Sequence, residues 1–324
     1  MSFYLPILPS KQISKLLLLV CCFVFTTGRT IAQQSPLFAA VKNNNIESLE
    51  SLLDNKVDVN VYDNDSDHIL MYAAMYASAD CMQLLIKKGA NVNAVNKIGE
   101  TPLMWCNHDI QKTKLLLQNG ADINAKAKSG NTALLIACVG SGQYEMVRLL
   151  LSKGADAKAI NELGQSALHR TAMFGDTATA ALLLSNGADV NACSKQKETA
   201  LRGAVTNENK QMVYWLLRKG ADPNIADSYD AVPLSYAVVL NDKEIVQAIL
   251  DKTTNINCVD IDGLTCLMWA CYDEHENPAI INALLKKGAR VDIKDKKGRT
   301  ALAWALKKGN TAKVTLIKKT GALE

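Results

Sequence analysis

Histidine changes charge near neutral pH and binds metals through its ring nitrogens, so the four histidines are the first candidates for chemistry. They are His68, His108, His169 and His275. No two of them stand at the spacing of a shared metal site. His275 lies in an acidic stretch with Asp273, Glu274 and Glu276, where an imidazole and carboxylates could touch a metal ion, but an exposed loop is the simpler interpretation.

Three alternating aspartates, Asp63, Asp65 and Asp67, match the start of a calcium-binding loop. Such a loop needs Gly at its sixth position and Glu at its twelfth. His68 and Ala74 stand there instead. We therefore interpret this stretch as a polar hairpin tip.

A second partial motif is glycine-rich. Gly140 and Gly142 begin a Gly-x-Gly pattern, but Glu145 occupies the place of the third glycine, so no phosphate-binding loop is indicated. Neither Gly-x-Ser-x-Gly nor His-Glu-x-x-His occurs in the chain. We predict no catalytic residue, no cofactor and no metal, and therefore a protein that is not an enzyme.

The elements that would position these side chains follow one repeated phrase. It is a Leu-Leu pair, two or three polar residues, usually Gly-Ala-Asp, and then a Val-Asn-like pair. The clearest copies span residues 84–93, 116–124, 183–191, 216–224 and 284–292. The phrase recurs about every 33 residues, and openings such as Thr101-Pro102-Leu103 and Ser166-Ala167-Leu168-His169 precede it.

In this period, opening and Gly-Ala-Asp ending the chain resembles the ankyrin-repeat family, with about nine repeats over residues 35–324. The resemblance implies an all-α solenoid of stacked helix-turn-helix units joined by hairpin loops. Thr at each opening should cap the first helix, and the Gly should end the second helix in a left-handed conformation. His169 falls at the family's Thr-Pro-Leu-His position, where a structural hydrogen-bonding role is implied.

Some repeats depart from this pattern. The third is shortened around residues 107–112, and the eighth is lengthened around residues 272–278. We expect both changes to fall on loops and to reshape the surface. The first repeat, 35–60, and the last, 293–324, are polar enough to serve as the end caps that a solenoid needs.

Residues 1–32 lie outside the repeats and have the pattern of a secretory signal peptide. Lys11 and Lys15 precede the apolar run 16–25, and residues 30–32 supply small residues for cleavage. We predict a mature ankyrin-repeat domain of residues 33–324, exported to the periplasm or secreted. An uncleaved anchor is less favoured because the apolar run is short. Lipid attachment at Cys21 or Cys22 is a third alternative.

The charge balance bears on the partner. The chain has 36 basic and 32 acidic residues, and removal of residues 1–32 leaves a net charge of about +1. This does not favour nucleic acid binding, which usually needs a strongly basic domain. A local basic end remains, which we interpret as a solvated face; it comprises Lys294, Lys296, Lys297, Arg299, Lys307, Lys308, Lys313, Lys318 and Lys319.

Seven cysteines remain after the signal segment. Four of them occupy positions on helix faces that suit small buried side chains: Cys81, Cys106, Cys138 and Cys271. Equivalent positions of neighbouring repeats should be too far apart for a disulfide. We expect Cys193 and Cys258, in the hairpin regions, to be the most exposed thiols.

In an ankyrin array, the resemblance implies, partners bind to a concave groove lined by hairpin tips and the ends of the first helices. The residues that fall at such positions change from acidic and aromatic, through apolar, to basic along the chain. The candidates are Asp65, Asp67, Met75, Tyr76, Leu163, Met173, Phe174, Tyr229, Leu240, Tyr272, Arg299 and Lys307. Lys97, Ile98, Glu100, Val239, Asp273, Lys297 and Lys308 flank them.

We therefore predict a monomeric, exported module that binds a partner protein without catalysis and has no stable membrane span once the signal is cleaved. An exported effector or immunity protein that blocks a toxin or enzyme is the alternative, because it would use the same surface.

Overall fold

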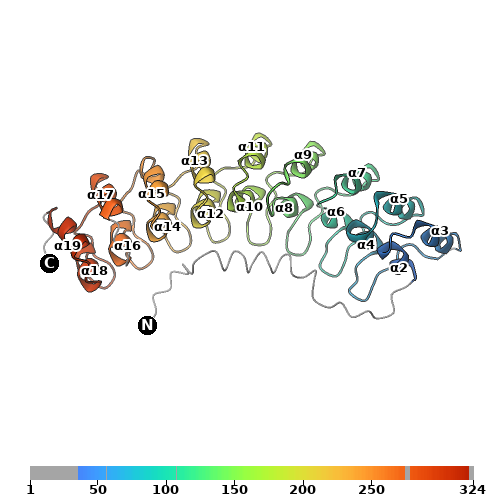
Figure 1. The fold of residues 1–324 in the computed structure, drawn as a ribbon, viewed down its shortest axis with the longest axis horizontal. Coiled ribbons are helices and arrows are strands. Elements are labelled where there is room, and N and C mark those ends of the chain that lie inside the picture. The colour runs from blue at the N-terminus through green and yellow to red at the C-terminus, as the bar shows by residue number, and fades with distance from the viewer. Residues whose placement is uncertain (1–35, 56, 107, 274–277, 321–324) are drawn as a thin grey trace. The chain divides into compact units, whose positions relative to one another are not determined.

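The computed structural model describes residues 36–55, 57–106, 108–273 and 278–320. The predicted signal segment and cleavage site lie outside these ranges, as does His275. Within the described ranges the chain is all-helical and forms nine consecutive pairs of short helices, as predicted (Figure 1). It divides into two compact units: residues up to Glu162 with Ala181–Gly187, and Leu163–Ala180 with the residues from Ala188 onward.

The first unit stacks helices in two layers. The first helix of each repeat packs on the first helix of the next, and the second helices pack in the same way. The first helices are α2 (Pro36–Lys42), α4 (Ile69–Tyr76), α6 (Pro102–Trp105) and α8 (Ala133–Ala137). The second helices are α3 (Ile46–Asp54), α5 (Ala79–Lys87), α7 (Ile110–Gln118) and α9 (Tyr144–Ser152).

The second unit repeats this arrangement, and the division between the units falls within α11 (Thr177–Ser185). Its first helices are α10 (Ala167–Phe174), α12 (Ala200–Thr206), α14 (Pro233–Val239), α16 (Cys266–Tyr272) and α18 (Ala301–Lys307). Its other second helices are α13 (Lys210–Arg218), α15 (Lys243–Leu250), α17 (Pro278–Lys286) and α19 (Thr311–Lys318). The hairpin loops of this unit project from the side of the first helices (Figure 1).

The Leu-Leu phrase supplies the core between the two layers. One leucine of each pair is fully buried, as at Leu85, Leu150 and Leu216. Burying such a side chain contributes roughly 1.5–3 kcal/mol. A single helix pair cannot cover its own apolar stripe, so this contribution depends on the neighbouring repeat.

The predicted helix ends are mostly confirmed. Thr132, Thr199, Thr265 and Thr300 each accept a hydrogen bond from a backbone N–H of the helix that they open. Thr101 is an exception, because its side chain makes no cap before Pro102. Gly220 follows α13 with φ +89°, the left-handed conformation that the sequence pattern predicted.

Where the Val-Asn-like pair contains an asparagine, that side chain links one repeat to the next. In the first unit, Asn93 accepts a hydrogen bond from the N–H of Asp122 (2.8 Å) and donates to the carbonyl of Gly120 (2.9 Å). In the second unit, Asn191 makes the same two bonds to Asp222 and Gly220. The repeated phrase therefore encodes a contact between repeats as well as the end of a helix.

Candidate protein-binding surface

The hairpin tips of the second unit carry large apolar side chains in contact with solvent. Leu163 is 55% exposed, Ile261 49% and Tyr229 37%. Backbone hydrogen bonds fix one tip against the next: the N–H of Lys195 donates to Leu163 (2.9 Å), and that of Ile261 donates to Tyr229 (2.9 Å). Since the backbone of the row is held in place, little backbone conformational entropy is lost when a partner binds to its exposed side chains.

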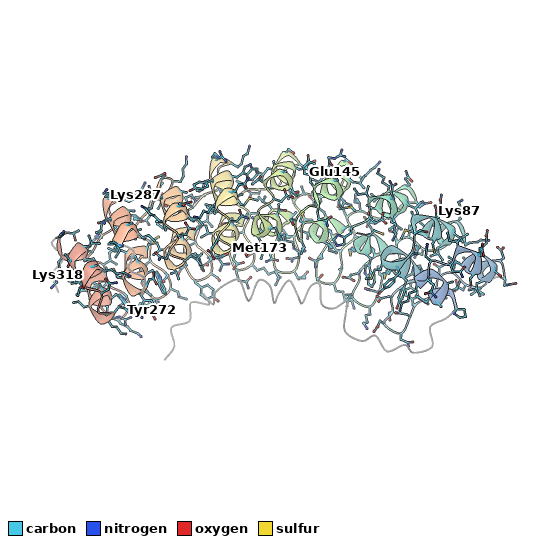
Figure 2. The ribbon with its side chains drawn as sticks, viewed as in Figure 1. Lys87, Glu145, Met173, Tyr272, Lys287 and Lys318 are labelled. Atoms are coloured by element: carbon cyan, nitrogen blue, oxygen red, sulfur yellow. The ribbon has the colours of Figure 1, made fainter. Side chains whose placement is uncertain are left out.

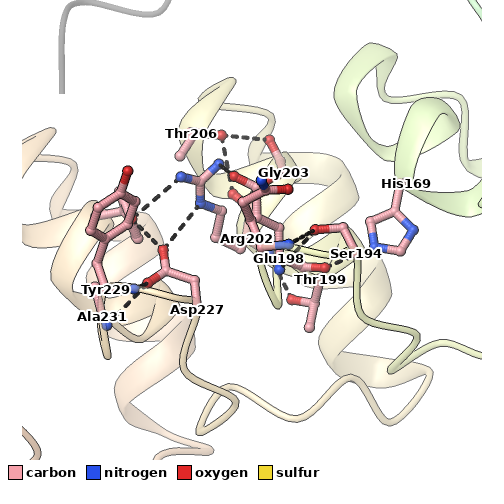
Figure 3. Close-up of polar contacts among 12 residues, drawn as sticks. His169, Ser194, Glu198, Thr199, Arg202, Gly203, Thr206, Asp227, Tyr229 and Ala231 are labelled. Carbon is pink, nitrogen blue, oxygen red and sulfur yellow. Dashed lines mark hydrogen bonds and ion pairs between the residues drawn. The ribbon is translucent and has the colours of Figure 1, made fainter. Parts of the chain in front are cut away.

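Tyr229 is positioned by the buried carboxylate of Asp227. One oxygen of Asp227 accepts hydrogen bonds from the N–H groups of Tyr229 (2.9 Å) and Ala231 (3.2 Å), as Figure 3 shows. The other oxygen accepts from the hydroxyl of Tyr236, nine residues further along the chain. The backbone of the exposed tip is therefore held by a carboxylate that is itself only 2% exposed.

Arg202, from the preceding repeat, supplies the cation beside this carboxylate. Its guanidinium forms an ion pair with Glu198 (2.8 Å) and approaches Asp227 to 3.8 Å (Figure 3). It also donates a hydrogen bond to the Tyr236 hydroxyl. Burial acts to lower the pKa of Arg202, but Tyr236, Glu198 and Asp227 together raise it above the ordinary value. Arg202 therefore stays charged and joins two repeats below the surface.

A basic and aromatic cluster brings three of the predicted residues together near the end of the unit. The rings of Tyr272 and Trp304 meet edge to face at 5.2 Å. Arg299 stacks on Trp304 at 3.8 Å, and the Lys307 ammonium lies 5.1 Å from the same ring. Cation–π contacts of this kind hold the cations over the aromatic face.

The carboxylate of Asp295 anchors this cluster. It accepts hydrogen bonds from Arg299 (2.8 Å) and from the indole of Trp304 (3.1 Å). Burial acts to raise the pKa of Asp295, but the backbone and guanidinium of Arg299 and the N–H of Lys297 hold that pKa below its ordinary value. Arg299 is therefore committed to internal contacts, while Lys307 is exposed.

Three further candidates lie near the ends of first helices. Met173 and Phe174 end α10 and are partly exposed. Figure 2 shows Met173 and Tyr272 on the side of the first helices, and Lys287 on the side of the second helices. Leu240 instead lines an open depression of about 730 Å³ between α13 and α15, together with Tyr214 and Lys210.

In the first unit, the prediction of Asp67 as a surface residue was wrong. Asp67 is only 4% exposed, because its carboxylate accepts a hydrogen bond from Asn96 of the next hairpin (2.9 Å). Asp65 remains accessible and pairs with Lys97 at 3.1 Å. Met75 and Tyr76, at the end of α4, are 36% and 40% exposed.

Among the described residues two lysines are buried, and the interpretation of Lys313 as part of a solvated face was wrong. Lys313 is 2% exposed, and its ammonium donates to the carbonyl of Ala270 (2.9 Å) in the last turn of α16. Lys112 is 6% exposed and caps α4 through the carbonyls of Ala73 and Ala74. A cation at a helix C-terminus offsets the partial negative charge of the unpaired carbonyls.

Sequence reasoning also missed Ile261 at the tip row and Trp304 in the cluster. The sequence did contain a signal for Ile261. It lies one residue after the buried Asp260, at the hairpin position that Ser228 occupies after Asp227, and Ser228 is the neighbour of the candidate Tyr229. Within the described ranges, no group of three or more His, Cys, Asp or Glu side chains could hold a metal ion. None of the helices there is both long and apolar enough to cross a bilayer.

Comparisons with known proteins agree with this architecture. A family model described as ankyrin repeats (3 copies) matches residues 12–96, 37–127, 70–161, 134–227 and 234–322. Among curated proteins, the E3 ubiquitin-protein ligase KEG of Arabidopsis thaliana is 28% identical over 138 residues. That alignment covers 42% of this chain but 7% of the ligase, so the likeness extends to a small segment of that protein.

Proposed function

Because this chain belongs to the ankyrin-repeat family, we propose that it is a non-enzymatic module that binds a partner protein through its hairpin tips and first helices. The observation that carries the proposal is the row of exposed apolar side chains at Leu163, Tyr229 and Ile261. Exposed leucine, isoleucine and tyrosine on a rigid backbone are typical of residues that become buried at protein interfaces.

The test is affinity capture with the full chain from an extract of the native organism. A double variant, Leu163→Asp and Tyr229→Asp, places two charges on the tip row. We expect it to lose the partner that the unaltered chain retains, because each carboxylate would have to be desolvated on binding.

Tyr214→Asp is the matched control. Tyr214 is 40% exposed, close to Tyr229 at 37%, but lies on α13 among the second helices. It should retain the partner, and circular dichroism should show the same helix content for all three proteins. Equal capture by the tip variant, or loss only in Tyr214→Asp, would show that the tip row is not the binding surface.

The proposal includes export, supported by Lys11, Lys15 and the apolar run 16–25. Mass spectrometry of the protein recovered from separate cell fractions tests this part. We expect a chain that begins at Gln33 in the extracytoplasmic fraction. A chain that retains Met1–Ala32 and is recovered with the cytosol would overturn export without affecting the binding surface.

A further inference from the structure

Cys258 and Cys266 stand opposite each other in the stem of one hairpin. Val259 and Thr265 form an antiparallel bridge, and the N–H of Asp260 donates to the carbonyl of Leu264 (3.0 Å). One step outward in the same register pairs Cys258 with Cys266. The Cα atoms of a bridged pair such as Val259 and Thr265 lie about 4.5–5.5 Å apart, within the range that a disulfide spans. Cys258 and Cys266, the first residue of α16, each stand one residue from this bridge, and their thiols are close enough to hydrogen-bond.

The two thiols are in contact but differ in access. Cys258 is partly exposed, whereas Cys266 is 1% exposed, and the Cys266 sulfur lies 3.5 Å from the hydroxyl oxygen of Ser235. A hydrogen bond from the Cys266 thiol lowers the pKa of Cys258. The same contact and burial raise the pKa of Cys266 well above its ordinary value. Cys258 is thus the more nucleophilic and more accessible partner.

The other cysteines of the described residues differ from this pair. Burial raises the pKa of Cys81 to about 11 and that of Cys106 and Cys271 to about 12. Cys138 is also buried, and Cys193 is exposed. In other hairpins the two stem positions hold residues without a thiol, such as Ala159 with Ala167 and Ala192 with Ala200.

We propose that Cys258 and Cys266 are a redox-active thiol pair that forms a reversible disulfide by exchange with a small-molecule disulfide of the glutathione type. The Cys258 thiolate attacks one sulfur of the reagent, whose S–S bond breaks, and the departing thiolate takes a proton from water. Cys266 then gives its proton to solvent and attacks the Cys258 sulfur, releasing the second reagent thiol. Two protein thiols are oxidised by two electrons, and one reagent disulfide is reduced to two thiols.

The experiment treats the reduced, folded full chain with mixtures of reduced and oxidised glutathione, followed by acid quenching and alkylation of the remaining thiols. A protease that cleaves at aspartate cuts at Asp260 and Asp262, between the two cysteines. We expect two fewer alkylated thiols per chain and a cross-linked peptide that joins Cys258 to Cys266, both reversed by dithiothreitol.

Alanine variants provide the controls, because alanine occupies both stem positions in other repeats and should preserve the fold. Cys266→Ala should stop at a mixed disulfide between Cys258 and glutathione. Cys258→Ala should give no cross-link, and Cys193→Ala should leave the cross-link unchanged. The proposal is overturned if Cys258 and Cys266 both remain reduced, and are therefore both alkylated, after treatment with excess oxidised glutathione. It is also overturned if the unaltered protein stops at the mixed disulfide.

Discussion

Two hairpins, one in each unit, contain the same pair of an aspartate and a tyrosine nine residues later. Asp63 accepts from the Tyr72 hydroxyl (2.7 Å), and Asp227 accepts from Tyr236. Each aspartate also accepts two backbone N–H groups of its own loop. The surroundings differ: Asp63 is only partly buried, whereas Asp227 is buried beside Arg202.

The aromatic partners are also held differently. Phe38 packs edge to face on Tyr72 at 4.7 Å, while the guanidinium of Arg202 lies 4.5 Å from the ring of Tyr236. The comparison shows that one loop geometry can be supported either by a buried aromatic neighbour or by a partly buried cation. The energetic weight of the aspartate should therefore differ between the two hairpins.

Replacing the aspartates should have the largest effect and should separate the two cases. Asp227→Ala leaves the Tyr236 hydroxyl and the N–H groups of Tyr229 and Ala231 without their acceptor. It also removes the carboxylate that lies 3.8 Å from the guanidinium of Arg202, so the total cost should be about 3–5 kcal/mol. Asp63→Ala loses bonds that water can replace, at a cost of about 1–2 kcal/mol. Urea unfolding of each single variant measures the difference, and equal losses would contradict the comparison.

Acid should destabilise the first hairpin selectively. Burial lowers the pKa of His68 to about 4, with Asp58 opposing, and its ring accepts a hydrogen bond from the N–H of Leu70. The unfolded chain, with a histidine pKa near 6.5, binds the proton first. Stability from this group is therefore complete above about pH 6.5 and falls by about 3 kcal/mol as the pH drops to about 4.

His68→Thr is the control for this acid effect, because threonine fills the same position at Thr132 and Thr199. The second hairpin has Val232 there, which does not titrate. Unfolding measured between pH 7 and 4 should show a smaller slope in His68→Thr than in the unaltered chain. The same slope in both proteins would mean that His68 does not carry the acid dependence.

Alkali should act on the second hairpin. Burial raises the pKa of Tyr236 to about 12, with Arg202 opposing and Asp227 adding to the rise. The unfolded chain loses the tyrosine proton first, near pH 10, so stability is complete below that pH. It should fall by about 2–3 kcal/mol as the pH rises to about 12.

Tyr236→Phe removes the group that titrates. Its stability should be lower at pH 8 because Asp227 loses a donor, but the decline between pH 10 and 12 should be smaller than in the unaltered chain. The raised thiol pKa values are common to both proteins and cancel in the difference. A decline that is unchanged in Tyr236→Phe would assign the alkaline effect to other groups.

The sequence was sufficient to predict the fold because each repeat contains the same local signals. The Gly of the phrase ends a helix, Thr opens the next one, and the leucines recur on one face. These signals act within a few residues, so no knowledge of the neighbouring repeat is needed. Stacking such repeats one on the next is the arrangement that covers the apolar stripe of each repeat.

The surface was harder to predict because exposure depends on the next repeat. Asp67 and Asp65 are equally polar in sequence, but Asn96, 29 residues further on, buries only the first. In sequence Lys313 resembles its solvated neighbours, but in the structure its ammonium donates a hydrogen bond to a carbonyl of α16. Its position in the helix matches Met146 and Met212, and this register is the signal that could have indicated burial.

The smallest effect on stability is expected from the exposed ion pair between Asp65 of the first hairpin and Lys97 of the next. Asp65 and Lys97 lie 3.1 Å apart, and their side chains are 49% and 59% exposed. Water screens such a pair, and ordering two side chains offsets part of the attraction, so the coupling should be about 0.2–1 kcal/mol.

A double-mutant cycle with Asp65→Ala and Lys97→Ala measures this coupling, and the same cycle with Glu198→Ala and Arg202→Ala provides the half-buried counterpart. Arg202 and Glu198 are 19% and 31% exposed in their side chains and meet at 2.8 Å. The second coupling should exceed the first and should persist at high salt, since a half-buried pair is screened less. Equal couplings with equal salt dependence would show that burial of Arg202 does not distinguish the two hairpins.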